Sequence, residues 1–301
     1  MLPCDEMKKM LLISNPVSGR RLSMYYINDI TRTFLDAGWL VSFYPTGYSG
    51  EATEMVRLNG SCFDAISCIG GDGTLNEVIS GELSAGLNIP IGYIPSGSTN
   101  DFANCHRIPS DMIAAARIAV GNRTEQVDIG LFNGRSFAYV AAFGAYSWLS
   151  YTTPQNLKNL LGHSAYLLNV VPDLTKLKAE CVRITADGKT FENEYIFGAV
   201  CNSTSVAGVL TIPEADVNTG DGKFEVILVR KPVDLPDFQE LLRCIIMQEY
   251  SSSPLIDFTH ASDIHVSCPG HLEWSLDGER GTPAPEIDIR VLPRRITLHV
   301  S

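Results

Sequence analysis

Residues 65–79 read AISCIGGDGTLNEVI, and this stretch decides the fold. An apolar run at 65–69 is followed by the glycine turn Gly70-Gly71-Asp72-Gly73-Thr74 and then by a pattern with helical spacing. Glycines adopt backbone conformations that other residues resist, and they let a ligand approach closely. The helix beyond the turn offers free N–H groups and the positive end of a dipole. The stretch predicts a strand, a phosphate-binding turn and a helix, with Asp72 placed to hold a magnesium ion.

Strands and helices alternate on both sides of this stretch. The predicted elements are strands at 10–13, 40–44, 65–69 and 89–94 and helices at 24–35, 50–58, 75–83 and 111–120. Ser110 is expected to cap the last helix and Gly121 to end it. This β-α repetition predicts a parallel sheet covered by helices.

The predicted secondary structure changes near residue 125, from alternating strands and helices to mostly short strands. Short strands are predicted at 127–131, 136–143, 179–185, 195–201, 224–229, 272–276 and 295–300, with helices near 155–171 and 236–247. Asn133-Gly134 and Asp187-Gly188 are typical of tight hairpin turns. We therefore predict an α/β domain over 1–125 and a β-rich domain over 126–293, with the last strand, about 294–301, as a candidate to return to the first domain.

Length and composition narrow the class of protein. The chain has 301 residues, which suggests two domains, and 45% of them are hydrophobic. No apolar run approaches the roughly 20 residues of a membrane span, and the acidic start of the chain is unlike a signal peptide, so a cytoplasmic location is expected. The eight cysteines form no Cys-x-x-Cys pair, which is typical of reduced thiols. A net charge of −11 argues against nucleic acid as a partner.

Four polar loops follow four consecutive predicted strands. They are 15–19 (NPVSG), the loop that contains Thr46, the glycine turn, and 95–103 (PSGSTNDFA). One such loop is most often a solvated turn. Ligands of open parallel sheets bind at the carboxyl ends of the strands, however, so four loops at that edge indicate a ligand site.

These motifs resemble those of the diacylglycerol kinase catalytic-domain family, the soluble bacterial lipid kinases related to sphingosine kinases. The matching residues are Asn15-Pro16-x-Ser18-Gly19, Thr46 with Glu51-Ala52, Gly70 to Glu77, Pro95-x-Gly97-Ser98-x-Asn100-Asp101-Phe102-Ala103, Asp221-Gly222 and Asp277-Gly278-Glu279. The glycine turn alone is shared with NAD kinases and phosphofructokinases. The resemblance implies an NAD-kinase-like or phosphofructokinase-like α/β domain followed by a mostly-β sandwich.

The resemblance also implies roles for individual residues. The expected ATP-binding residues are Asn15, Pro16, Val17, Ser18, Gly19, Thr46, Gly70, Gly71, Asp72, Gly73, Thr74, Leu75, Asn76 and Ser98. Ser98 stands where the family usually has threonine, which keeps the hydroxyl. Asp72, with Asp101 as a candidate helper, would hold the catalytic Mg²⁺. Either Asp277 or Glu279 would act as the general base, and the sequence does not choose between them.

A second metal site is implied near an Asp-Gly turn in the second half of the chain. Its expected ligands are Asn218, Asp221 and Lys223, partly through backbone carbonyl groups, with Asp216 as a substitute. The spacing back to Pro213 is longer than the family usually shows, which leaves the partner of Asp221 open. Hard oxygen ligands of this kind suit magnesium or calcium.

The expected activity is that of an ATP-dependent lipid kinase, with diacylglycerol as the first candidate acceptor. The apolar stretch from Trp148 to Val171 could contact lipid at the inner face of the membrane or simply pack on the β-domain, and Arg20, Arg21 and Lys158 could supply local basic charge. The alternatives are an NAD-kinase-like phosphotransferase and a non-catalytic nucleotide or lipid sensor. A homodimer through an edge strand at 295–300 is one option for assembly.

Overall fold

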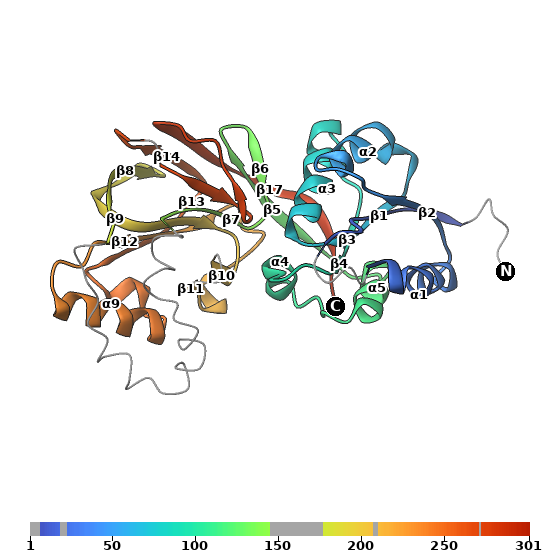
Figure 1. Ribbon diagram of the computed structural model, residues 1–301, viewed down its shortest axis with the longest axis horizontal. Coiled ribbons are helices and arrows are strands. Elements are labelled where there is room, and N and C mark those ends of the chain that lie inside the picture. The colour runs from blue at the N-terminus through green and yellow to red at the C-terminus, as the bar shows by residue number, and fades with distance from the viewer. Residues whose placement is uncertain (1–6, 19–22, 145–176, 207–209, 271) are drawn as a thin grey trace. The chain divides into compact units, whose positions relative to one another are not determined.

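The computed structural model describes residues 7–18, 23–144, 177–206, 210–270 and 272–301 (Figure 1). The chain divides into two compact units: unit 1 takes 1–129, 219–221 and 292–301, and unit 2 takes 130–218 and 222–291. The sequence placed the division after residue 125 and did not foresee the return of 219–221 to unit 1. Several residues with predicted roles lie outside the described residues, namely Gly19, Arg20, Arg21, Lys158 and the stretch from Trp148 to Val171, with the predicted helix at 155–171.

Unit 1 is built on a parallel sheet with the strand order β2-β1-β3-β4-β17. The strands are β1 Lys8–Ser14, β2 Trp39–Pro45, β3 Ala65–Gly70, β4 Ile91–Pro95 and β17 Glu286–His299. Every residue of β3 and β4 is buried, as is typical of parallel strands covered on both faces. Among the described strands, β2 pairs only with β1, and it is mostly exposed or half-buried, as is typical of an edge strand.

The helices of unit 1 follow these strands in alternation. They are α1 Ser23–Asp36, α2 Glu51–Asn59, α3 Asp72–Ala85, α4 Asp101–Cys105 and α5 Met112–Ala119, with a 3₁₀ turn at Gly60–Cys62. Helix α2 packs against α3, and α1 packs against α5. The parallel α/β architecture predicted for this part of the chain is therefore present.

Hydrogen bonds explain why the starts of α3 and α5 differ from the prediction. Helix α3 begins at Asp72 rather than Leu75, because the amides of Thr74 and Leu75 both donate to the carbonyl of Gly71 and already form a helical turn. Helix α5 is capped by Asp111 rather than Ser110, since the Asp111 side chain accepts a hydrogen bond of 2.7 Å from the amide of Ala114. The predicted cap was one residue early.

Residues 295–300, predicted as an edge strand that could pair in a dimer, do not lie at an edge of the sheet. In unit 1 it pairs with β4 and with β5 (Thr124–Phe132), so residues near 295–300 have a neighbouring strand on each side. The amide of Val300 donates to the carbonyl of Arg123, and Gln126 bonds Thr297. A strand with both sides paired cannot add a further strand from a second copy.

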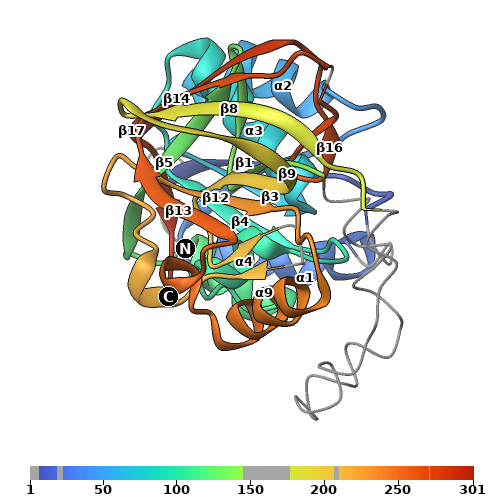
Figure 2. The same ribbon diagram turned by 90° about the vertical axis from the view of Figure 1, so that its left-hand side faces the viewer.

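Unit 2 is a set of antiparallel strands with one described α-helix, α9 Leu235–Met247. The strands are β6 Arg135–Phe137, β7 Val140–Phe143, β8 Glu180–Ala186, β9 Lys189–Cys201, β10 Ser205–Val206, β11 Leu210–Thr211, β12 Phe224–Arg230, β13 Ile256–Ala261, β14 Asp263–Ser267, β15 Trp274–Leu276 and β16 Glu279–Arg280. Strands β8 and β9 form a long hairpin around Asp187-Gly188 (Figure 2), whose positive φ angles, 46° and 84°, are those of the predicted tight turn. Two further 3₁₀ turns lie at Glu214–Asp216 and Tyr250–Ser252.

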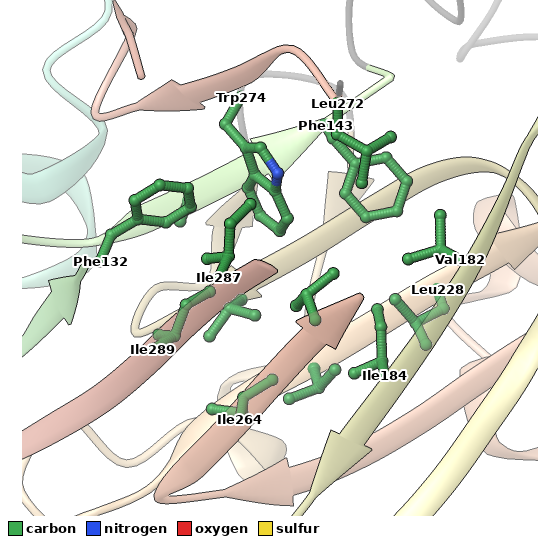
Figure 3. Close-up of a cluster of buried hydrophobic side chains, with 14 of the residues drawn as sticks. Phe132, Phe143, Val182, Ile184, Leu228, Ile264, Leu272, Trp274, Ile287 and Ile289 are labelled. Atoms are coloured by element: carbon green, nitrogen blue, oxygen red, sulfur yellow. The ribbon is translucent and has the colours of Figure 1, made fainter. Parts of the chain in front are cut away.

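The core of unit 2 is an aromatic and aliphatic cluster (Figure 3). The Trp274 ring meets Phe132 and Phe143 edge-on, with ring centroids 5.1 and 5.0 Å apart. Such edge-to-face pairs add about 0.5–1.5 kcal/mol beyond the area that they bury. Trp274 lies on β15, three residues before Asp277, so this packing holds the strand that leads into the predicted catalytic turn.

Candidate active site

The loops after β1 and β2 are joined to their neighbouring strands by backbone hydrogen bonds. The amide of Asn15 donates to the carbonyl of Ile69 at the end of β3, at 3.0 Å. The amide of Thr46 donates to the carbonyl of Ser14 at the end of β1, at 2.8 Å. Because all these strands are parallel, the loops leave the same edge of the sheet, as the sequence predicted.

The loop after β4 joins the same network. The amide of Ser96 donates to the carbonyl of Gly70 at 2.8 Å, and the hydroxyl groups of Ser18 and Ser96 lie 2.7 Å apart. The side chain of Asn15 donates to the hydroxyl of Thr74 on helix α3, at 3.4 Å. Residues from all three motifs thus meet at one edge within unit 1.

The N-terminus of α3 is open toward this edge. Gly71 is the N-cap residue and supplies no side chain to bond the first amides of the helix. A Cβ atom built on Gly97 would lie 2.7 Å from the Cα atom of Gly71, so the two loops touch through bare backbone. The Asn100 side chain fixes Gly97 by accepting from its amide at 2.9 Å and donating to its carbonyl at 3.1 Å. The N-terminus of a helix beside such close-packed backbone suits a phosphate group.

Asp72 is the first residue of α3 and is largely buried, at 9% exposure. Its Oδ1 atom accepts from the hydroxyl of Tyr93 and its Oδ2 atom accepts from the amide of Asp101, both at 3.3 Å. Asp101 begins α4 and is also buried. The two acids predicted to handle Mg²⁺ are therefore joined through the backbone amide of Asp101, and Tyr93 is a neighbour that the sequence did not single out.

The other predicted nucleotide residues differ in what they can offer. The side chain of Leu75 is fully buried in the core, so only its backbone faces the turn. Val17 is 71% exposed and Ser98 is exposed. Asn76 accepts a hydrogen bond of 3.1 Å from Ser80 on the next turn of α3. Pro16, Ser18, Thr46 and Gly73 are half-buried.

Asp277 lies on the turn between β15 and β16, and its carboxylate is bound by backbone amides. It accepts from Ala138 at 2.6 Å and from Tyr139 and Val140 at 3.0 Å each. The side chain is buried, at 5% exposure. These bonds also explain why the single strand predicted over 136–143 is two strands, since the amides at 138 and 139 turn away to Asp277. Asp277 acts as an anchor for the turn.

Glu279 presents its carboxylate to solvent two residues later. Its side chain is 50% exposed, and its Oε2 atom accepts from Arg135 at 2.6 Å. Arg135 also donates to the carbonyl of Arg280 at 3.0 Å, which holds the guanidinium against β16. Of the two acids on this turn, Glu279 is the one that can reach a substrate.

The predicted second metal site lies on the turn at 216–223. Its four expected ligands, Asp216, Asn218, Asp221 and Lys223, are all exposed. Among the described residues, no three His, Cys, Asp or Glu side chains gather in a way that could hold a metal. A cation at this turn would depend on Asp221 and on carbonyl oxygens, a donor set that suits Mg²⁺ better than zinc.

Residues in the middle of this turn are fixed within unit 1. The amide of Asp128 donates to the carbonyl of Thr219 at 2.8 Å, and Nε of Arg294 donates to the carbonyl of Gly220 at 3.1 Å. Asp128 is buried and accepts from the amide of Arg294 at 2.5 Å. These contacts account for the assignment of 219–221 to unit 1.

Comparison with known proteins assigns the family. Residues 9–132 match the model of the diacylglycerol kinase catalytic domain, and residues 149–300 match that of the YegS C-terminal NAD kinase beta sandwich-like domain. A Staphylococcus epidermidis protein named diacylglycerol kinase is 33% identical over 280 residues, which span 92% of this chain and 88% of the relative. The chain belongs to the diacylglycerol kinase family.

Further similarities agree with this family. A Bacillus subtilis protein named diacylglycerol kinase is 33% identical over 282 residues, or 93% of this chain and 92% of the relative. The crystal structure of a proposed diacylglycerol kinase from Bacillus anthracis superposes with a TM-score of 0.79 at 25% identity, covering 98% of this chain and 96% of that one. The predicted family and fold class, an α/β domain followed by a β-sandwich-like domain, are confirmed. This family of kinases also gives ATP as the expected cofactor.

The sequence did not predict the hydrogen bonds of Glu77 and Glu51, two acids close to the glycine turn and the Thr46 loop. Glu77, which follows the glycine turn on α3, accepts hydrogen bonds from Gly50 and Ala52 at the start of α2. Glu51 accepts from the amide of Gly47 and from the hydroxyl of Tyr44, which hold the pKa of the Glu51 carboxyl below its ordinary value. Both glutamates were part of the resemblance, but their partners lie on other elements and leave no local pattern.

Proposed function

We propose that this kinase transfers the γ-phosphate of ATP to the hydroxyl group of a membrane lipid, with diacylglycerol as the acceptor and phosphatidic acid as the product. The observation that supports ATP as the donor is the N-terminus of α3, whose N-cap residue, Gly71, has no side chain and directly precedes Asp72. The names of the relatives, diacylglycerol kinase, support the acceptor.

The chemistry requires a phosphate site, a base and charge neutralisation. The lipid hydroxyl oxygen forms a bond to the γ-phosphorus, the bond from that phosphorus to the β–γ bridging oxygen breaks, and ADP leaves. The hydroxyl proton passes to Glu279, which is exposed, rather than to Asp277, whose oxygens are bound by three amides. Mg²⁺, when bound, supplies charge that neutralises the β- and γ-phosphates, and Asp72 and Asp101 are the residues that would hold it.

The acceptor places the enzyme at a membrane surface. Among the described residues, no helix is both long and apolar enough to cross a membrane. We propose peripheral contact with the inner face of the membrane from the cytoplasm. The net charge of −11 then requires that the contacting surface be segregated from the acidic remainder of the chain.

Transfer of labelled phosphate from ATP tests the proposal directly. The acceptors are diacylglycerol, monoacylglycerol, phosphatidylglycerol, undecaprenol and a long-chain base in mixed micelles, with NAD as a soluble acceptor. We expect product from diacylglycerol and dependence on added Mg²⁺. Transfer to NAD alone would replace the proposal with an NAD-kinase-like activity, and nucleotide binding without transfer to any acceptor would point to a sensor.

A further inference from the structure

Glu77 joins the helix that follows the glycine turn to the loop that contains Thr46. Its Oε1 atom accepts from the amide of Gly50 at 2.8 Å and from the hydroxyl of Ser49 at 3.3 Å, and its Oε2 atom accepts from the amide of Ala52 at 3.2 Å. Gly50 is the N-cap residue of α2 and provides no side-chain cap. A carboxylate on α3 thus supplies the cap that α2 lacks.

Helices α2 and α3 are also held in close contact along their length. The hydroxyl of Thr53 donates to the backbone carbonyl of Glu77 at 2.9 Å. A Cβ atom built on Gly81 would lie 2.7 Å from the Cβ atom of Val56, so the helices meet at a glycine with no room for a side chain. The start of α2 is therefore fixed to the same helix whose first residue is Asp72.

The loop between β2 and α2 is consequently held at both ends. On its first side, the amide of Thr46 donates to Ser14 and the amide of Gly47 donates to Glu51. On its second side, Glu77 binds Ser49 and Gly50. The Thr46 hydroxyl itself donates to the carbonyl of Ser14 at 3.3 Å, and Glu77 fixes the far end of the same loop.

Glu77 also sets the charge at this edge of the sheet. The N-terminal ends of both α2 and α3 carry positive partial charge, which attracts anions. At α2 that charge meets the carboxylates of Glu77, Glu51 and Glu54, and at α3 it meets the carboxylate of Asp72. The start of α2 therefore repels a phosphate group more than the start of α3 does, and Glu77 contributes to that difference.

We propose that Glu77 is a positioning residue of the nucleotide site, which fixes the far end of the Thr46 loop to α3 and adds to the negative charge at the start of α2. This inference depends on the proposed use of ATP, and it extends that proposal to a residue that does not itself contact the nucleotide. A purely structural cap would lower stability and leave nucleotide affinity unchanged, so the two roles can be separated by experiment.

The test compares the wild-type chain with Glu77→Ala and Glu77→Gln, and uses Glu82→Gln as the matched control. Glu82 lies on the same helix and also accepts a backbone amide, from Ile89 at 2.7 Å, but it lies toward the other end of α3. ADP affinity in Mg²⁺ is measured by calorimetry, and amide exchange over 47–53 is measured without nucleotide. Unfolding in urea reports stability for each variant.

In Glu77→Ala we expect the dissociation constant for ADP to rise about tenfold or more, since charge-assisted hydrogen bonds are lost. Glu77→Gln should lie between this variant and the wild type, because its amide oxygen can still accept one of the two amides. Exchange at Gly50 and Ala52 should quicken in both variants, while Glu82→Gln keeps wild-type affinity and exchange.

Two results would overturn the inference alone: ADP affinity within about twofold of wild type in both folded variants, or exchange as slow as in the wild type. If Glu77→Ala fails to fold, the ADP affinity and amide exchange of the isosteric Glu77→Gln variant test the inference. A wild-type protein that binds no adenine nucleotide would instead overturn the proposed function and this inference with it.

Discussion

Gly71 and Gly97 touch through bare backbone, since a Cβ atom on Gly97 would lie 2.7 Å from the Cα atom of Gly71. Gly71 directly precedes helix α3, and Gly97 belongs to the loop after β4. Their contact joins the glycine turn directly to the loop after β4. Any added atom at this contact must push the two loops apart.

Gly97→Ala is therefore expected to weaken nucleotide binding more than it weakens the fold. The added methyl also meets Oδ1 of Asn100 at 2.7 Å, so the strain should cost about 1–3 kcal/mol and fall on the loops of the site. We expect the dissociation constant for ADP in Mg²⁺ to rise about tenfold or more, measured by calorimetry. Gly270→Ala is the control, because its nearest neighbour is the Glu180 side chain at 3.9 Å. Equal affinity in both variants would contradict this account.

Glu279→Gln is expected to remove turnover while leaving the fold intact. The side chain is exposed and paired only at its Oε2 atom among the described residues, so thermal stability should change little. If Glu279 accepts the hydroxyl proton, kcat should fall by about 10²–10⁴ with ADP affinity unchanged. Steady-state kinetics with diacylglycerol micelles measure this, and a variant with wild-type kcat would exclude Glu279 as the base.

Asp277→Asn, unlike Glu279→Gln, is expected to lower the stability of the fold rather than to act directly on turnover. Its amide group would place N–H donors against the amides of Ala138, Tyr139 and Val140, which the native carboxylate accepts. We expect a loss of about 1–3 kcal/mol in the free energy of unfolding, measured in urea, with any loss of activity following the loss of fold. Unchanged stability together with abolished turnover would instead make Asp277 the acid that takes the proton.

The sequence predicted those features that depend on local pattern. Strands β3 and β4 are continuous apolar runs between turn residues, and both are fully buried strands in the structure. The different surroundings of Asp277 and Glu279 could not be predicted, because Asp277 binds amides that lie 137 to 139 residues away in the chain. The same long-range contact divides the predicted strand at 136–143 into two.

The start of α3 shows that the sequence could not predict the first residue of a helix. Asp72, Gly73 and Thr74 have poor helix propensity, so the sequence placed them in the turn. In the structure they form the first turn of the helix, since the carbonyl of Gly71 accepts the amides of Thr74 and Leu75. Helix boundaries follow such capping geometry, which intrinsic propensity does not describe.

Two alanine substitutions at the start of α5 test which residue caps this helix. Asp111 accepts the amide of Ala114, whereas the sequence favoured Ser110 as the cap. Asp111→Ala should lower the free energy of unfolding by about 1 kcal/mol, because an amide of the first turn loses its acceptor. Ser110→Ala should have an effect smaller than about 0.5 kcal/mol in the same urea titration. The reverse order of the two effects would restore Ser110 as the cap.

Glu82 is expected to make stability fall as pH rises. The carboxyl is fully buried on α3, and burial raises its pKa to about 7, although the amide of Ile89 and the charge of Arg295 oppose the shift. Between its ordinary value of 4.5 and about 7, the folded protein keeps a proton that the unfolded chain has released. The wild type should therefore lose on the order of 3 kcal/mol across this range relative to Glu82→Gln, which carries no titrating group at the site. Urea unfolding of both proteins at several pH values from 4 to 8 measures the difference, with full stability below the lower pKa and the loss complete above the higher one. Parallel curves for the two proteins would show that Glu82 is already ionised in the folded state.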